Sequence, residues 1–322
     1  MKILIIAPTA IPIPVRGYGG IELEAQWFAE ALVKMGHAVT LMGNVEEGPN
    51  PQGWEGIRLE TETAPIRVDR YPLLRSFDVV HDFSHAKVCR LVKFPPTTRY
   101  LSTTMWTDTQ SGVDVYPSQA VREAFKDPKA PVIPLGIPLG EAKTASPPSG
   151  FACLGRIASF KGQDLAIRIA KAMNVPLVVA GHQGPFGDPY YALTVRRMCQ
   201  EAGFSFIPNP PSLDDLLENC AGLVHTHRWL ESFSLIAAQA LVRGVPILTT
   251  DQGAPQEWVR ATDGGLIVPL KELEAGHWEV ARPFFDINWS SRRLGIMKRA
   301  RAMFDIEKVL DAYAPLYGGG RK

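Results

Sequence analysis

The amino-acid sequence predicts an α/β protein built from two doubly wound halves. Short apolar runs alternate with amphipathic, helix-compatible segments along most of the chain, as in parallel sheets covered by helices. The alternation stops in a Pro- and Ser-rich stretch of small residues at 138–150 and then begins again. At 322 residues the chain is also longer than one typical domain.

The expected elements of the first half begin with an apolar strand followed by a Pro-rich loop, glycines and a helix. That helix is expected to bury Leu23, Trp27, Ala31, Leu32 and Met35, which recur at helical spacing. A Ser-capped helix is expected near the end of this half. The segments that carry the expected strands and helices are 2–7, 21–35, 37–43, 56–60, 77–85, 99–109 and 113–125.

Polar and glycine residues follow two expected strands of the first half. Gly19 and Gly20 precede the first helix, where backbone amides can approach a phosphate closely, although a plain tight turn explains them equally well. The glycine spacing does not match the dinucleotide-binding fingerprint. His81 and Asp82 end another strand, and ligands of parallel sheets bind beyond the carboxyl ends of strands. A loop histidine without a ligand is the equal alternative for His81.

The second half repeats the strand–helix alternation. Strands are expected at 151–157, 176–181, 204–208, 222–226 and 245–248, and helices at 160–173, 190–202, 213–220 and 235–242. After residue 269 the chain is expected to be loop-like, with Trp278, Phe284 and Phe285 packing against a surface. A basic helix at 290–304 and a last helix at 305–317 are expected to follow.

Composition is typical of a globular enzyme and argues against several other classes. Hydrophobic residues make up 46% and charged residues 21% of the chain, and the formal charge of +1 gives no field that would attract a nucleic acid. The first apolar run is too short for a signal peptide or a membrane span, so we expect a cytoplasmic protein. Its four cysteines are scattered without a Cys-x-x-Cys pair, which predicts reduced thiols and no metal site.

Three charged residues of the second half stand where ligands of parallel sheets bind. Arg156 ends the first strand of this half, and Lys161 follows shortly before a helix. Two fixed cations at such a place suit a diphosphate, because Arg grips two oxygens and Lys supplies a point charge. Glu231 lies just before the helix at 235–242. Ordinary surface charges are the alternative, but the strand-end position, facing the cleft expected between the halves, favours a ligand site.

Segments along residues 2–317 resemble glycosyltransferase family 4, in the order in which that family has them. They read GYGGIE, DVVHDF, STTMWTD, VIPLGIP, GRIASFKG, RWLESFSLIAAQALVRGVP and GAPQEWV. The family consists of retaining, nucleotide-sugar-dependent enzymes of the GT-B fold, in which two Rossmann-like domains face a cleft. The resemblance implies an acceptor-side domain at 1–138, joined by a returning helix at 305–317, and a nucleotide-sugar-binding domain at 139–304.

The resemblance also assigns roles to single residues. Glu231 matches the family's first signature glutamate, which holds hydroxyls of the donor sugar. Arg156 and Lys161 match the diphosphate-binding pair, so these residues and Glu231 form the implied catalytic set. The other implied donor contacts are Gly19 and Gly20 at the diphosphate, Ser232, Phe233, Ser234 and Leu235 in the turn, Gln239 at the ribose and Glu257 near the pocket.

Two positions depart from the family pattern. Gln239 stands where the family has a ribose-binding glutamate, and an amide lacks the charge-assisted, two-oxygen grip of a carboxylate. Trp106 stands where the family has a histidine beside the reacting sugar, and an indole cannot shuttle a proton. His81 and Asp82, at a neighbouring strand end, are candidates to compensate as substrate contacts.

The implied activity is retaining transfer of a hexose from a nucleotide diphosphate to a carbohydrate, small-molecule or lipid-linked acceptor. The sequence contains no Asp-x-Asp motif, so we expect no metal and no cofactor apart from the donor. Two alternatives remain open. One is a sugar-nucleotide-binding protein that has lost catalysis, and the other is a GT-B enzyme of another type, a phosphorylase or an epimerase.

Overall fold

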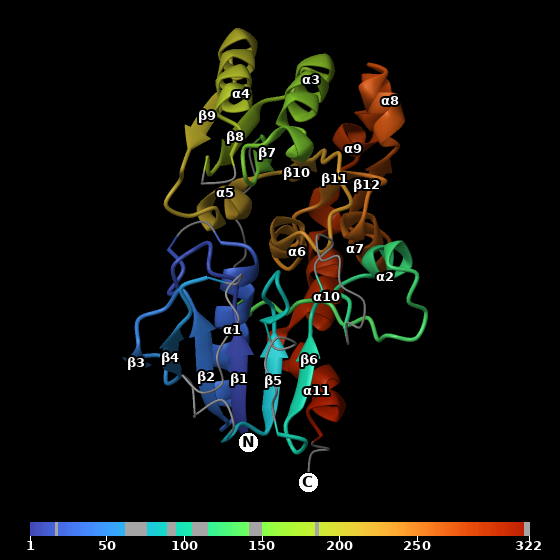
Figure 1. Ribbon diagram of the computed structural model, residues 1–322. Coiled ribbons are helices and arrows are strands. Elements are labelled where there is room, and N and C mark those ends of the chain that lie inside the picture. Colours follow the sequence, from blue (N-terminus) through green and yellow to red (C-terminus); the bar gives the residue numbers. More distant parts are fainter. Residues whose placement is uncertain are drawn as a thin grey trace. The chain divides into compact units, whose positions relative to one another are not determined.

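The protein divides into two compact units, each built around its own sheet (Figure 1). A computed structural model describes residues 1–16, 19–61, 76–88, 95–104, 115–141, 150–183 and 187–318. Unit 1 comprises Met1–Pro138 with Phe304–Lys322, and unit 2 comprises Leu139–Met303. Within these described ranges each unit holds a six-stranded sheet, which confirms the predicted α/β class.

The sheet of unit 1 has the strand order β3-β4-β2-β1-β5-β6. Every pairing is parallel except that of β3 with β4. The central strand β1 pairs on both sides, with Ile3 opposite Val39 of β2 and Val79 of β5. The strands are β1 (Lys2–Ile6), β2 (Ala38–Gly43), β3 (Gly48–Pro49), β4 (Glu55–Arg58), β5 (Val79–Asp82) and β6 (Arg99–Ser102).

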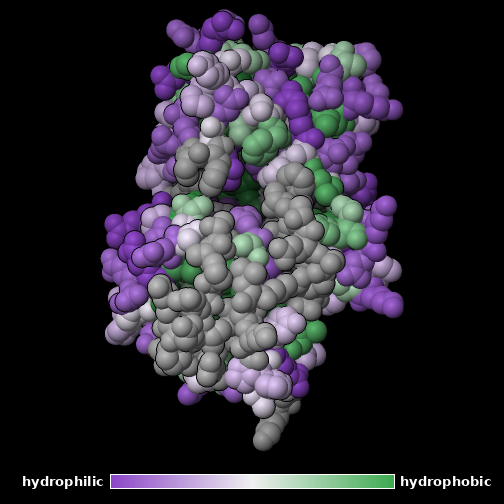
Figure 2. Space-filling view, viewed as in Figure 1, coloured by the Kyte–Doolittle hydropathy of each residue, from purple (hydrophilic) through white to green (hydrophobic). Residues whose placement is uncertain are grey.

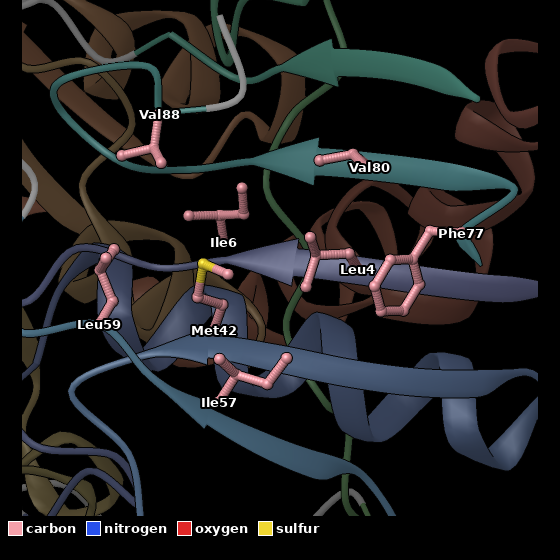
Figure 3. Packing of buried hydrophobic residues seen from close by; sticks show 8 residues of the cluster. All are labelled: Leu4, Ile6, Met42, Ile57, Leu59, Phe77, Val80 and Val88. Atoms are coloured by element: carbon pink, nitrogen blue, oxygen red, sulfur yellow. The ribbon is translucent and has the colours of Figure 1, made fainter. Parts of the chain in front are cut away.

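One face of this sheet carries a compact apolar core (Figure 3). Leu4 and Ile6 are two residues apart on β1, so both side chains project from the same face. They pack with apolar side chains from neighbouring strands and loops, and burial of each such side chain contributes about 1.5–3 kcal/mol. The other members are Met42, Ile57, Leu59, Phe77, Val80 and Val88.

Helices α1 (Ile21–Lys34) and α11 (Ile306–Tyr317) pack against each other in unit 1. The ring of Phe28 meets that of Tyr313 edge-on, with centroids 5.5 Å apart. The face that α1 buries is only partly the predicted one: Ala31 and Leu32 are buried as predicted, but Met35 is 39% exposed, and Phe28 and the carboxyl of Glu24 are buried. Counting apolar residues alone missed this face, because it contains a glutamate.

The last helix returns to the first unit, as predicted. Ile137 and Asp305 form an isolated parallel bridge, in which the Ile137 amide donates to the Phe304 carbonyl at 2.7 Å. Asp305 then caps α11 by accepting from the amide of Glu307. The predicted Ser-capped helix is α2 (Gln119–Ala124), where the Ser118 hydroxyl accepts from the Val121 amide.

The sheet of unit 2 has the order β12-β11-β10-β7-β8-β9, and all of its pairings are parallel. The strand order reverses between β7 and its neighbour β10, which makes this position the topological switch point of the sheet. The strands are β7 (Phe151–Leu154), β8 (Leu177–Gly181), β9 (Ser205–Pro208), β10 (Gly222–His225), β11 (Ile247–Thr250) and β12 (Gly265–Val268).

Helices connect these strands in the predicted alternation. The segment expected as one helix at 160–173 is split by Gly162 into a short 3₁₀ turn, η3, and helix α3. The elements are η3 (Ser159–Lys161), α3 (Gln163–Met173), α4 (Pro189–Ala202), α5 (Asp214–Asn219), α6 (Leu235–Leu241), α7 (Ala254–Thr262) and α10 (Arg293–Phe304).

The expectation of loop-like chain after residue 269 was wrong. The segment contains α8 (Leu270–Glu274), η4 (Trp278–Ala281), α9 (Arg282–Asp286) and η5 (Trp289–Ser291). Phe284 is fully buried, and its carbonyl accepts from the Trp289 indole at 2.7 Å. Helices this short contain too few turns to show an apolar period, so the sequence gives little sign of them.

Two arginines of α10 donate hydrogen bonds to backbone carbonyls at the C-terminal ends of neighbouring helices. Arg293 donates to the carbonyl of Cys220, the C-cap of α5, at 3.2 Å. Arg299 donates to the carbonyl of Thr262, the last residue of α7, at 2.6 Å. Arginines near helix C-termini satisfy carbonyls that lack an intrahelical partner, so these charges serve the packing of unit 2.

The surface in Figure 2 is mainly hydrophilic over the described parts of both units. Cys153, Cys199 and Cys220 are buried and free, and burial raises the pKa of Cys199 and of Cys220 to about 11. Their thiols are therefore protonated and unreactive near neutral pH. The fourth cysteine, Cys89, lies outside the described residues.

Candidate functional site

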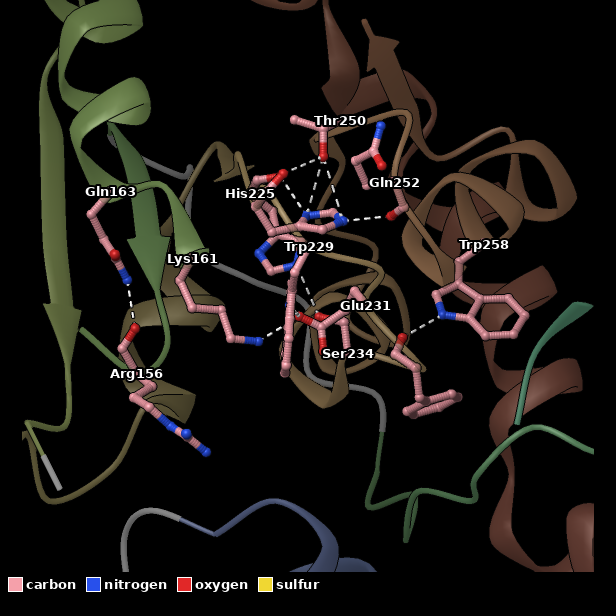
Figure 4. Close-up of polar contacts among 12 residues, drawn as sticks. Arg156, Lys161, Gln163, His225, Trp229, Glu231, Ser234, Thr250, Gln252 and Trp258 are labelled. Carbon is pink, nitrogen blue, oxygen red and sulfur yellow. Dashed lines mark hydrogen bonds and ion pairs between the residues drawn. The ribbon is translucent and has the colours of Figure 1, made fainter. Parts of the chain in front are cut away.

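Two of the three charged residues singled out in unit 2, Lys161 and Glu231, are paired at the switch point of its sheet, and Arg156 lies on the same loop as Lys161 with its side chain directed away from the pair (Figure 4). Arg156 and Lys161 follow β7, and Glu231 follows the adjacent strand β10. The loops that leave neighbouring strands at a switch point diverge, which opens the crevice where α/β sheets bind ligands. Lys161 forms an ion pair with Glu231, so the two loops are joined at this point.

Glycines shape the loop that carries Arg156 and Lys161. Gly155 has φ +135° and open space where a Cβ would project, so its backbone is accessible to a ligand. Gly162 has φ +71°, and a Cβ there would collide with the carbonyl of Thr226. The Thr226 hydroxyl donates to the Gly162 carbonyl at 2.7 Å. This close approach fixes the first loop against the chain that follows β10.

Arg228 also ties the two loops together, although no role was predicted for it from the sequence. Its backbone amide donates to the Phe160 carbonyl at 2.7 Å, and its guanidinium donates to the Ser159 carbonyl at 2.9 Å. The guanidinium also grips both oxygens of Asp164 at 2.8 Å, and Tyr191 donates to the same carboxylate. Arg228 thus holds the 3₁₀ turn from which Lys161 projects.

Glu231 is a buried carboxylate held in the ionised form. Its Oε2 accepts from Lys161 and, at 2.7 Å, from the Trp229 indole. Burial by itself raises the pKa of Glu231, but Lys161, and then His227 and His225, outweigh it and lower the pKa to about 2. The Lys161 ammonium lies 4.7 Å from the Trp229 ring, a cation–π contact that further fixes its position.

The backbone of Glu231 is fixed by the loop after β11. The Ala254 amide, at the start of α7, donates to the Glu231 carbonyl at 2.8 Å. Gly253 has φ +69°, and a Cβ there would collide with backbone atoms of Glu231. The glycine is therefore needed both for its left-handed conformation and for the space it leaves. Both the backbone and the side chain of Glu231 are thus held before any ligand arrives.

The turn after Glu231 is packed from below. Phe233 is buried against Trp258, with ring centroids 5.5 Å apart, and the Trp258 indole donates to the Phe233 carbonyl at 2.7 Å. Ser234 has φ +66° and precedes α6, whose first residue is Leu235. The neighbouring Ser232 is only partly buried. Among the predicted turn residues, Phe233 is therefore a buried anchor, whereas Ser232 is more accessible.

Two buried histidines under this turn were missed by the sequence reasoning. His225 forms a hydrogen bond with the Ser234 hydroxyl at 3.0 Å, and His227 donates to the Gln252 carbonyl at 2.6 Å. Their rings are 4.6 Å apart. Burial lowers the pKa of both, so both are neutral near pH 7. The sign of them in the sequence was that two histidines stand two residues apart at the end of an expected strand.

The remaining predicted residues of unit 2 lie on helices. Gln239 is on α6 and partly buried, and its carbonyl accepts from Arg243 at 3.0 Å. Glu257 is in the first turn of α7 and also partly buried.

Unit 1 places its two predicted glycines at the start of α1. Gly20 is the N-cap, and a Cβ added there would meet nothing within 4 Å. A Cβ on Gly19 would collide with Val15. Gly20 is thus the position at which an incoming group could approach the helix start closely, whereas Gly19 is required by packing.

His81 and Asp82 lie in the core of unit 1. Both ring nitrogens of His81 are engaged, Nδ1 with the Tyr317 hydroxyl at 2.8 Å and Nε2 with the Thr103 hydroxyl at 2.7 Å. Asp82 accepts from the amide and hydroxyl of Ser84. Both side chains are fully buried, so this geometry gives them structural roles and does not support direct substrate contact. Trp106 lies outside the described residues.

The part of the chain that the structure describes lacks two further kinds of feature. No group of three or more His, Cys, Asp or Glu side chains there is placed to hold a metal ion. No helix there is long and apolar enough to cross a membrane.

Comparison with known proteins defines the class to which this fold and site correspond. Residues 141–282 match the family described as "Glycosyl transferases group 1", and this segment contains Arg156, Lys161 and Glu231. Solved structures of similar architecture establish the GT-B fold, with two Rossmann-like domains. Residues 141–282 are thus similar to a group 1 glycosyltransferase domain, and the fold of the chain is GT-B.

Particular relatives follow from the same comparison. D-inositol 3-phosphate glycosyltransferase of Mycobacterium tuberculosis is 31% identical over 203 residues, 59% of this chain and 40% of the relative. AviGT4, a glycosyltransferase involved in avilamycin A biosynthesis, is 20% identical with a TM-score of 0.76, over 98% of this chain and 97% of that one. HepE of Anabaena, solved with UDP and glucose, is 16% identical with a TM-score of 0.75, over 99% and 100%.

The match to the curated relatives is partial in length. The aligned stretch spans 40% of the M. tuberculosis enzyme, less than two thirds of its length. The family match likewise ends at residue 282 and begins at residue 141. The family match therefore lies within unit 2, which holds the ion pair of Lys161 with Glu231.

Proposed function

We propose that the protein is a retaining glycosyltransferase that moves a hexose from a nucleotide diphosphate to an acceptor hydroxyl without a metal ion. One observation carries the proposal: Lys161 pairs with the ionised Glu231 at the switch point of the sheet in unit 2, and Arg156 lies on the loop after β7 that also carries Lys161. This is the segment that matches the group 1 family. The cations suit a diphosphate, and the carboxylate suits the hydroxyls of a sugar.

The chemistry asked of these residues is mainly electrostatic. In a retaining transfer of this type, the bond between the sugar and the diphosphate breaks as the acceptor oxygen bonds to the same face of the sugar. The leaving diphosphate accepts the proton of the acceptor hydroxyl. Arg156 and Lys161 would stabilise the negative charge that develops on the leaving group, which is the task a metal ion performs in other enzymes.

Glu231 would orient the donor sugar. It remains a carboxylate across the physiological pH range, because its pKa is about 2. Among the described residues, Lys161 and Trp229 both donate to its Oε2, which leaves Oε1 to accept from a sugar hydroxyl. A carboxylate that is fixed before the ligand binds needs little reordering, so its hydrogen bonds favour binding more strongly.

The solved neighbours guide the choice of probe. HepE of Anabaena has been solved with UDP, with UDP-glucose, and with UDP and glucose. The curated relative is named for an inositol phosphate acceptor. For the present protein we therefore take UDP and UDP-hexoses as the first donors to test, with a carbohydrate, small-molecule or lipid-linked acceptor.

Thermal melting with a nucleotide panel tests the proposal. A ligand of the folded state raises the melting temperature by mass action, so one of UDP, GDP, ADP and dTDP should raise it. The matching sugar nucleotide should then release its nucleotide slowly in the presence of the protein. A melting temperature that none of these ligands changes would overturn the donor-site proposal.

The second candidate is a sugar-nucleotide-binding protein that has lost catalysis. It is favoured by Gln239, which stands where the family that the sequence resembles has a ribose-binding glutamate. If Gln239 contacts the ribose, then Gln239→Glu should tighten nucleotide binding by about tenfold, because a carboxylate grips a diol with two charge-assisted bonds. Calorimetric titration of both proteins measures the change. Equal affinities would show that Gln239 does not contact the ribose.

A further inference from the structure

Ser234 adopts a backbone conformation that side chains rarely take. Its φ of +66° lies in the left-handed region, where a Cβ crowds the following carbonyl and where glycine is the usual residue. The residue stands at the junction between the turn that begins at Glu231 and helix α6. The conformation must therefore be held by something other than the intrinsic preference of serine.

His225 supplies a hydrogen bond to this serine. The imidazole Nε2 lies 3.0 Å from the Ser234 hydroxyl oxygen, and both side chains are buried. His225 comes from the end of β10, a rigid part of the sheet, where its neighbours pair with β7 and β11. The bond therefore links the turn after Glu231 to the sheet below it.

The His225 ring is itself fixed by a second layer. It packs against the ring of His227 at 4.6 Å. The His227 ring donates to the Gln252 carbonyl at 2.6 Å, and the His227 carbonyl accepts from the Thr250 hydroxyl at 2.7 Å. Contacts thus run from the end of β11, through two histidines, to the hydroxyl of Ser234. In Figure 4, His225 and Thr250 lie above Glu231 and Ser234.

We propose that His225 is a positioning residue for the donor site, because its bond to Ser234 holds the turn after Glu231 in its left-handed conformation. This inference rests on the proposed function, since the turn matters only if Glu231 and its neighbours contact a nucleotide sugar. The serine–histidine pair performs the task that a glycine would perform through its own flexibility. It also makes the turn stiffer than glycine would, so less order has to be gained on binding.

A double-mutant cycle on His225 and Ser234 tests the inference. His225→Phe keeps a ring but removes the bond, and we expect it to weaken UDP binding by about tenfold. Ser234→Gly also removes the bond while relieving the strained conformation. In the Ser234→Gly background, His225→Phe should therefore weaken UDP binding by less than about twofold, because no bond remains for it to break. Calorimetry measures affinity, and melting without ligand measures stability.

A second pair of variants keeps the test decisive if His225→Phe fails to fold. Ser234→Ala loses the hydroxyl and keeps a Cβ in the left-handed region, whereas Ser234→Gly loses the hydroxyl without that strain. We expect the alanine variant to bind UDP at least about threefold more weakly than the glycine variant. Asn174, left-handed at the C-cap of α3, is the matched control, and Asn174→Ala and Asn174→Gly should bind UDP equally.

The outcomes separate this inference from the proposed function. If the unaltered protein binds none of the four nucleotides, the proposed function fails and the positioning role fails with it. If the unaltered protein binds UDP, but His225→Phe weakens UDP binding by the same factor in the unaltered protein and in the Ser234→Gly variant, only the positioning role is overturned. Reduced stability with unchanged UDP affinity in the His225→Phe variant would likewise show that the histidine merely fills the core.

Discussion

Replacing Lys161 by methionine removes the charge that holds Glu231 ionised while keeping a side chain of similar length. Glu231 is 6% exposed and the Lys161 side chain 18% exposed, so the pair is largely shielded from water. Burial raises the pKa of Glu231, and Lys161 is the largest of the groups that lower it, to about 2 from 4.5. At 1.36 kcal/mol per unit, the shift corresponds to about 3 kcal/mol of stability at neutral pH.

The variant should therefore lose at least about 3 kcal/mol near pH 7, because the stabilisation from the lowered pKa disappears and burial then raises the pKa of Glu231. The pH dependence of the free energy of unfolding that Glu231 contributes should also change sign. In the unaltered protein the folded-state pKa of Glu231 is depressed, so its stabilisation is present above about pH 4.5 and lost as the pH falls towards 2. In Lys161→Met, burial dominates and raises the pKa of Glu231, so stability is lost as the pH rises.

Urea unfolding at about pH 7 and about pH 5 measures this difference. Hydrogen exchange of peptides from β10 assigns the transition to unit 2. Glu231→Gln is the matched control, because it removes the titrating group and should show neither effect of pH at this site. Stability of Lys161→Met within about 0.5 kcal/mol of the unaltered protein near pH 7, or an identical pH dependence, would refute the reasoning.

Two further variants test the packing around the site and the role of the buried histidine in unit 1. Gly253→Ala should cost more than about 3 kcal/mol of stability, because the added Cβ would collide with Glu231. Gly203→Ala is the control, with a similar φ but open space around the Cβ, and should cost about 1 kcal/mol. Equal losses of stability in urea unfolding would contradict this prediction. Tyr317→Phe should lower the stability of unit 1 by about 1–2 kcal/mol, because His81 loses a hydrogen-bond partner. The affinity for UDP should stay unchanged. A lower affinity for UDP would instead connect the hydrogen bonds of His81 to the ligand.

Much of the fold could be predicted from the sequence, because the central parallel strands are buried on both faces and therefore appear as apolar runs. The run that forms β1 and the restart at β7 are examples. What the sequence obscured was structure set by tertiary contacts. Glu24 faces inward because α11 covers α1, and the short helices between residues 270 and 291 pack around Phe284 without an apolar period of their own.

The candidate site was partly visible for a related reason. Arg156, Lys161 and Glu231 stand next to strand ends in the sequence, and parallel topology brings such ends to one edge. The parts that hold them in place were not visible. Arg228 and His225 act through carbonyls and hydroxyls that are distant along the chain or unremarkable in type, so only the folded arrangement reveals them.

The central claim is that unit 2 binds a nucleotide diphosphate sugar through Arg156 and its neighbours, and calorimetric titration of UDP tests it most directly. We predict saturable binding at one site, weakened at least about tenfold by Arg156→Ala, because a guanidinium bound to phosphate oxygens is lost. Arg197→Ala on α4, where the side chain is 72% exposed, should leave the affinity unchanged. No heat of binding with UDP or with the other three nucleotides, or equal affinity in the Arg156→Ala protein, would contradict the account.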